Sequence, residues 1–228
     1  MFDDLTDIAG IIDQTLLKPE ATHVEYEGFI QRNANKGFHT LFVPPLYLSL
    51  MAKLLSKSTT LAGGIVGFPY GWETRREKLY QLNQALSQGA DEIDFVINIS
   101  KLKSSDYIYL KDEFKAMREE ALKVKNKRGE KIILKCIIEC CLLSDDEKRK
   151  ACEMLVEERI DFVKTSTGTS KWGAKADDVK LLKDAGRGLI KVKASGGIRS
   201  LADMRAMVNA GASRVGTSAG LEIVNALK

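Results

Sequence analysis

The chain has 228 residues, 44% of them hydrophobic and 29% charged, with only 4 prolines. This composition is typical of a globular protein and excludes the fibrous and intrinsically disordered classes. The formal net charge of +4 is modest and has no repeated basic or aromatic pattern with it, so we expect no nucleic-acid partner.

Targeting and metal-binding signals are weak in this sequence. Residues 1–5 include acidic side chains where a secretory signal would carry positive charge, and no apolar run approaches a membrane span of ~20 residues. We therefore expect a cytoplasmic protein that has no membrane partner. The four cysteines lack the paired spacing of a zinc site, and His23 and His39 are remote from them. This pattern predicts reduced thiols, no metal site and no cofactor.

Short apolar runs alternate with helical patterns along the chain. The expected strands are residues 11–17, 38–43, 64–68, 92–98, 132–139, 162–167, 189–195 and 213–218. The clearest expected helices are residues 74–88, 106–124, 144–158 and 201–210. Alternation of strand and helix predicts parallel strands, and eight such units in fewer than ~250 residues fit a (β/α)8 barrel. A doubly wound sheet is the alternative, but it would show five or six strands and an early glycine-rich fingerprint. We therefore predict an α/β fold, a (β/α)8 TIM barrel that forms a single domain over residues 1–228.

Charged residues occur in these runs where a barrel interior is normally aliphatic. Because strand side chains alternate in direction, Lys164 and Lys193 fall on inward faces, as do Asp94 and Lys135 in their own strands. Unpaired buried charges are costly, so the lysines either belong to a functional site or form structural ion pairs with Asp94 and Glu139. Lys164 and Lys193 lie near strand C-termini, where barrels carry their chemistry, and this position favours the functional site. A lysine amine there can act as a nucleophile.

Glycine turns follow the seventh and eighth expected strands. Gly196 and Gly197 come shortly after Lys193, and Gly216 lies just before Ser218 at the end of the next strand. Barrels often bind phosphate between these two loops, through backbone N–H groups and a short helix N-terminus, and glycine permits a close approach. The sequence therefore predicts a phosphate site beside the lysines. The alternative is that both turns are only tight connections between strand and helix.

An ordered set of motifs extends over nearly the whole chain. The motifs are residues 12–19, 67–69, 89–94, 164–168, 193–199 and 211–218. On these motifs the chain resembles the deoxyribose-phosphate aldolase family, whose members are class I aldolases with a (β/α)8 fold. The two lysine segments are the most specific part of the resemblance.

The resemblance implies a lyase that acts in deoxyribonucleotide and nucleoside catabolism. It would reversibly cleave 2-deoxy-D-ribose 5-phosphate into D-glyceraldehyde 3-phosphate and acetaldehyde. Lys164 would form the Schiff base, Lys193 would perturb it, Asp94 would be the acid/base partner and Lys135 a supporting charge. An ordinary lysine has a pKa of about 10.4 and is protonated at pH 7, so burial and the like charge of Lys193 would have to keep Lys164 neutral. The iminium would take the place of a Lewis acid, so no metal is implied.

The resemblance also assigns the rest of the site and the partners. The residues implied to hold the phosphate are Gly196, Gly197, Gly216 and Ser218. Those implied to hold sugar hydroxyls or ordered water are Asp13, Thr15 and Thr167. The partners would be small phosphorylated sugars and aldehydes, and further copies of the chain in a homodimer or other homo-oligomer.

Some positions depart from the family's usual residues. Gln14 stands where histidine is common, Phe42 where cysteine is frequent, and Pro44 where asparagine is frequent. The stretch 169–172 is variable in the family, and the chain ends at Lys228 without the C-terminal tyrosine of some members. These differences leave the lysine chemistry intact and leave the aldehyde range open. Two alternatives also remain, a Schiff-base aldolase with another donor and a phosphate-binding barrel without turnover.

Overall fold

The computed structural model describes residues 8–227, and their strands form one closed parallel barrel in which each strand pairs with the next and β8 pairs with β1. The strands are β1 (Ile12–Thr15), β2 (Thr40–Phe42), β3 (Leu61–Val66), β4 (Glu92–Val96), β5 (Ile133–Ile137), β6 (Phe162–Lys164), β7 (Lys191–Ser195) and β8 (Arg214–Thr217). Each expected strand overlaps one of these, so the predicted (β/α)8 barrel is confirmed. The acidic residues 1–5 and the terminal Lys228 lie outside the described residues.

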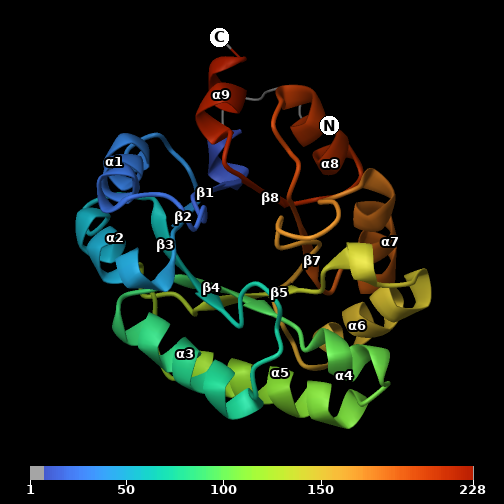
Figure 1. Ribbon diagram of the computed structural model, residues 1–228. Helices are drawn as coiled ribbons and strands as arrows, with labels where there is room; N and C mark the ends of the chain where they lie inside the picture. The colour runs from blue at the N-terminus through green and yellow to red at the C-terminus, as the bar shows by residue number, and fades with distance from the viewer. Residues whose placement is uncertain (1–7, 228) are drawn as a thin grey trace.

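Helices surround the strands as a ring (Figure 1). The α-helices are α1 (His23–Asn33), α2 (Leu48–Leu54), α3 (Arg75–Ser87), α4 (Ile99–Lys103), α5 (Tyr107–Ala121), α6 (Asp145–Glu157), α7 (Ala176–Gly186), α8 (Leu201–Asn209) and α9 (Gly220–Asn225). Short 3-10 turns are η2 (Ala9–Ile11), η3 (Pro45–Tyr47) and η4 (Cys140–Leu142). Within residues 8–227, no helix combines the length and apolar character that crossing a bilayer requires.

The positions at which several helices begin follow from local capping chemistry. Capping boxes start α1 at Thr22, α3 at Thr74, α6 at Ser144 and α8 at Ser200. In each box the hydroxyl accepts a backbone N–H of the first turn, and an acidic side chain three residues later accepts the N–H of the cap residue. These caps fix where each strand-to-helix loop ends, and so they fix the loops that surround the barrel mouth.

The hydrophobic core lies between the strands and the helices. Val163 and Val192 face outward into this core, while their neighbours Lys164 and Lys193 face the barrel interior. The register pairs Lys164 with Lys193, but it pairs Lys135 with Phe162. The even spacing of the three lysines in the sequence therefore does not place them in one row across the barrel, and Lys135 lies one layer deeper.

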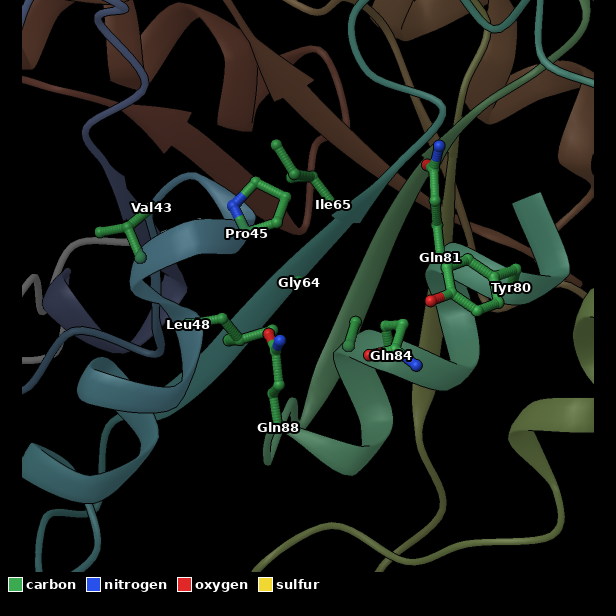
Figure 2. Close-up of a pocket in the computed structure, with 10 residues that line it drawn as sticks. Val43, Pro45, Leu48, Gly64, Ile65, Tyr80, Gln81, Gln84 and Gln88 are labelled. Atoms are coloured by element: carbon green, nitrogen blue, oxygen red, sulfur yellow. The ribbon is translucent and has the colours of Figure 1, made fainter. Parts of the chain in front are cut away.

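A small cavity lies outside the barrel, between α2, α3 and β3 (Figure 2). Gly64 lines it on the β3 side, where a side-chain Cβ would come within 2.8 Å of Ile93 Cδ1. Figure 2 shows Gln81 reaching from α3 past this cavity, and its Oε1 accepts a 2.7 Å hydrogen bond from the Gly67 backbone N–H. Gln81 thereby anchors the loop after β3, whose Phe68 forms part of the mouth of the barrel.

Candidate active site

A cavity of about 350 Å³ opens where β1, β6, β7 and β8 end. Each of these strands contributes a polar side chain to the wall, namely Thr15, Lys164, Ser195 and Thr217. This volume suits a small ligand, and the carboxyl ends of the strands are where barrel enzymes place their sites.

Lys164 is the lysine of the barrel interior that reaches this cavity. It lies on the cavity wall, whereas Lys193 is 1% exposed and is not among the lining residues. The Nζ atoms of both lysines contact the same oxygen, Asp94 Oδ2, at 2.8 Å from Lys164 and 2.6 Å from Lys193. Two amines that compete for one carboxylate oxygen can exchange a proton over a short path.

Lys193 is held between two carboxylates below the cavity. Its Nζ lies 2.5 Å from Asp13 Oδ2 as well as 2.6 Å from Asp94 Oδ2. Burial, helped by the charges of Lys164 and Lys135, outweighs the attraction of both carboxylates and lowers the pKa of Lys193 to about 8. An amine with this pKa is partly neutral near neutral pH.

Asp94 is the centre of the lysine group. Its side chain is fully buried, and its Oδ1 accepts a 3.0 Å hydrogen bond from Lys135. Burial alone would raise the pKa of Asp94, but Lys135, Lys164 and Lys193 together lower it well below its usual value. Burial would likewise lower the pKa of Lys135, and the carboxylates Asp94, Glu92 and Asp13 instead raise it. Asp94 is therefore ionised in the free protein, and Lys135 is a fixed positive charge.

A second layer of charge lies beneath these groups, and of its residues only Asp13 was expected at the site from the sequence. Arg214 Nη1 contacts Asp13 Oδ1 at 2.8 Å and Glu92 Oε2 at 3.1 Å, and its Nη2 is 3.0 Å from His39 Nε2. Asp13, His39 and Glu92 are close enough together to hold a metal ion. Arg214 bridges all three, and Lys135 lies 2.7 Å from Glu92 Oε2, so protein cations already occupy the positions that an ion would take.

Phe42 forms an aromatic floor under the lysines. The Nζ atoms of Lys193, Lys135 and Lys164 lie 4.3, 5.0 and 6.0 Å from the centroid of its ring. Gly63 on the next strand makes room for the ring, since a Cβ there would overlap it. A cation near an aromatic face is stabilised by the ring's quadrupole, so Phe42 replaces part of the hydration that burial removes.

The glycine turns meet at the side of the cavity formed by β7 and β8. Gly196 and Gly197 have φ of +85° and +77°, a left-handed conformation that favours glycine. Lys18 and Arg199 also line the cavity and add positive charge to this wall. Neither was singled out from the sequence, because nothing local shows which exposed cations face a cavity.

The start of α8 differs from the sequence expectation of a free helix N-terminus. The backbone N–H groups of Arg199 and Ser200 both donate to Asp203 Oδ2 at 3.0 Å. This carboxylate already neutralises the positive end of the helix, so these two amides are not free for an anion. The glycine turns, Ser218 and the basic side chains of Lys18 and Arg199 also line the cavity and suit an anion.

The other candidate residues divide between the wall and the floor of the cavity. Thr15, Thr167, Gly216 and Ser218 line it, while Asp13 is fully buried beneath it. The alternative of structural ion pairs holds in part, because Asp94 contacts all three lysines, whereas within the described residues Glu139 has no lysine ion partner. It accepts hydrogen bonds from the backbone N–H and the hydroxyl of Thr167. Of the variable stretch 169–172, Thr169 lines the cavity.

Comparison with known proteins identifies the family of this chain. Residues 9–226 match the model of the DeoC/LacD family aldolases. The chain is 46% identical to a deoxyribose-phosphate aldolase of Finegoldia magna over 93% of this chain and 96% of that protein. It is 43% identical to one of Caldanaerobacter subterraneus over 99% of this chain and 96% of that protein.

Solved structures of aldolases are also similar to this chain. The aldolase QR15 superposes with a TM-score of 0.90 at 33% identity, over 97% of this chain and 96% of that one. A structure described as a tetrameric deoxyribose phosphate aldolase from Aeropyrum pernix has a TM-score of 0.85 at 28% identity, over 96% and 90% of the two chains. The chain therefore belongs to the DeoC/LacD family of aldolases.

Proposed function

We propose that this chain is a deoxyribose-phosphate aldolase, a class I aldolase that reversibly cleaves 2-deoxy-D-ribose 5-phosphate into D-glyceraldehyde 3-phosphate and acetaldehyde. The observation that carries the proposal is a lysine amine on a cavity wall, within 2.8 Å of a carboxylate oxygen that it shares with a second lysine of lowered pKa. Relatives with this name over nearly the full chain support the same substrate.

In the first step, Lys164 becomes the nucleophile. Because its pKa is lowered, Lys193 is neutral in a fraction of the molecules near pH 7. In these molecules it takes a proton from Lys164 by way of Asp94 Oδ2, which both Nζ atoms contact. The neutral Lys164 amine attacks carbon 1 of the open-chain sugar and gives a carbinolamine. Loss of water then forms the iminium, whose positive nitrogen remains beside the ionised Asp94.

In the second step, the bond between carbons 2 and 3 breaks. A base removes the proton of the carbon 3 hydroxyl, the electrons of the bond flow to the iminium, and an enamine forms while glyceraldehyde 3-phosphate leaves. Asp94, Lys193 and a bound water are the candidates for this proton transfer. Protonation of the enamine and hydrolysis release acetaldehyde and restore Lys164. The iminium nitrogen is the electron sink, so the proposal needs no metal or cofactor.

Substrate binding is assigned to the cavity wall formed by the glycine turns after β7 and β8. The phosphate would lie at the turns of Gly196, Gly197, Gly216 and Ser218, near Arg199 and Lys18. Thr15 and Thr167 would bind sugar hydroxyls or ordered water from the wall. Asp13 would act from below through its contact with Lys193, and Lys135 would hold Asp94 in place.

Trapping with borohydride tests the proposal. Substrate plus borohydride should reduce the iminium to a stable secondary amine, and peptide mass spectrometry should place the added mass on Lys164. A Lys164→Ala variant should lose both trapping and cleavage, whereas Lys191→Ala on the exposed start of β7 should retain both. Full cleavage by Lys164→Ala would refute the mechanism. Binding without trapping or turnover would identify a non-catalytic barrel, and preference for another sugar phosphate would identify a different donor.

The wider setting is part of the same proposal. We place the enzyme in the cytoplasm, in deoxyribonucleotide catabolism, as a homo-oligomer whose single domain spans residues 1–228. Sedimentation of the purified chain measures the oligomer, and growth of a deletion strain on deoxyribonucleosides measures the metabolic role.

A further inference from the structure

The interior of the barrel holds seven charged groups joined by direct contacts. The carboxylates are Asp13, Glu92 and Asp94, and the cations are Lys135, Lys164, Lys193 and Arg214. Within this network, full protonation of the lysines leaves one positive charge without a matching carboxylate. The loss of one proton from a lysine brings the network to neutrality, which is the state that burial favours.

Arg214 supplies the charge that creates this surplus. An arginine remains protonated in proteins, and Arg214 is buried with its Nη1 between Asp13 and Glu92. The other oxygen of Asp13, Oδ2, contacts Lys193, and Glu92 Oε2 contacts Lys135 as well as Arg214. Arg214 therefore weakens the hold of each carboxylate on a lysine.

The remaining neighbours of Arg214 do not cancel its charge. His39 Nε2 lies 3.0 Å from Arg214 Nη2 and must accept its N–H, so the ring is neutral with its proton on Nδ1, facing Thr40. Burial and Arg214 both lower the pKa of His39, which agrees with a neutral ring. On the β6 side, Arg214 Cζ lies 5.4 Å from the Phe162 ring centroid, and this contact adds no charge.

We propose that Arg214 is a positioning residue for the lysine pair: by sharing Asp13 with Lys193 and Glu92 with Lys135, it keeps one of the two amines on Asp94 unprotonated near neutral pH. This inference rests on the proposed function only in taking that pair to be the nucleophile and its proton acceptor. Without Arg214, three carboxylates would match three ammonium groups, and both amines on Asp94 would keep their protons.

The pH dependence of kcat/KM tests this role. Arg214→Gln should move the acid limb of the profile up by about one pH unit, since a charge contact of this kind shifts a pKa by about 1–3 units, and should lower the rate near pH 7 about tenfold. Arg214→Lys keeps the charge and should leave the limb close to that of the wild type. An equal loss of rate at every pH in both variants would mean a merely structural role and would overturn the proposal.

A charge-compensating pair provides a second, independent test. Glu92→Gln removes a carboxylate, so it should move the limb to lower pH, and the double variant Arg214→Gln/Glu92→Gln should return it toward the wild-type position. If circular dichroism shows that Arg214→Gln alone does not fold, the acid limbs of Glu92→Gln and of the double variant test the proposal instead. No downward shift in Glu92→Gln would overturn the proposal.

Labelling without substrate separates this inference from the proposed function. Trace acetic anhydride reacts with the neutral amine, and mass spectrometry of the Lys164 peptide across pH reports when that amine becomes free. A labelling midpoint that rises in Arg214→Gln supports the inference even if the wild type does not cleave deoxyribose 5-phosphate. An unchanged midpoint overturns it even if the wild type is an active aldolase.

Discussion

A methyl group added at Gly196 should destabilise the protein in two ways, through backbone strain and through a clash with the loop after β6. Its φ of +85° disfavours any residue with a Cβ, and that Cβ would lie 2.9 Å from Gly173 Cα and 3.1 Å from Gly168 Cα. Both neighbours are backbone atoms of the loop after β6, which cannot rotate away as a side chain could. Gly196→Ala should therefore cost about 1–2 kcal/mol for the left-handed conformation and about 1–3 kcal/mol more for overpacking.

Gly188→Ala is the matched control. Gly188 has a similar φ of +77°, but a Cβ there would meet nothing within 4 Å. Urea unfolding should show the conformational cost alone in Gly188→Ala and the larger sum in Gly196→Ala. The displaced loop carries Thr167 and Thr169, so Gly196→Ala should also raise KM for the phosphorylated sugar while Gly188→Ala leaves it unchanged. Equal losses of stability and unchanged KM in both variants would refute the close packing of Gly196 against the loop after β6.

Three further predictions concern the buried charges. Because burial lowers the pKa of Lys193 to about 8 and the reaction needs a neutral amine, kcat/KM of the wild type should fall as pH drops below about 8; a flat profile from about pH 6 to 9 would contradict this. Phe42→Leu removes a ring that stabilises protonated lysines by about 0.5–2 kcal/mol, so it should move that limb toward lower pH by about half a unit or more, and an upward shift would exclude the cation–π role. Lys78→Met breaks a fully buried 2.9 Å ion pair with Glu113 and should lower the free energy of unfolding in urea by about 3–5 kcal/mol. Lys180→Met breaks an exposed pair with Asp184 and should leave the urea midpoint nearly unchanged. Similar losses in both variants would show that burial is not the cause.

The barrel could be predicted from the sequence because its signals are local. Each strand falls in or beside a short run that is rich in apolar residues, and helices such as α3 and α6 begin at capping residues that can be read directly from the chain. The inward direction of Lys164 and Lys193 followed from the two-residue period of a strand. Their shared contact with Asp94 agrees with this periodicity, although the sequence could not say that both would bind the same oxygen.

The lower charge layer could not be predicted because it depends on closure of the barrel. Arg214 and Asp13 are 201 positions apart, and they meet only because β8 pairs with β1. The alternation rule does place Arg214 on the same face as Gly216, so its inward direction could have been predicted from the sequence. The partners of Arg214 could not have been predicted, because the register of the strands sets how deep a side chain lies in the barrel. The same limit explains why the sequence could not show that Lys135 lies one layer deeper than the other two lysines.

The origin of these charges along the chain has a consequence for assembly. The three carboxylates of the network come from β1 and β4, whereas all four cations come from β5, β6, β7 and β8. Each half of the barrel would bury a cluster of like charges if it folded alone, so each is electrostatically incomplete. Opposite charges should draw the halves together. The contact of both lysines with Asp94 Oδ2 forms only after the two halves have met. During synthesis on the ribosome, a partly folded chain would therefore be unable to join both lysines to Asp94 before β7 is in place.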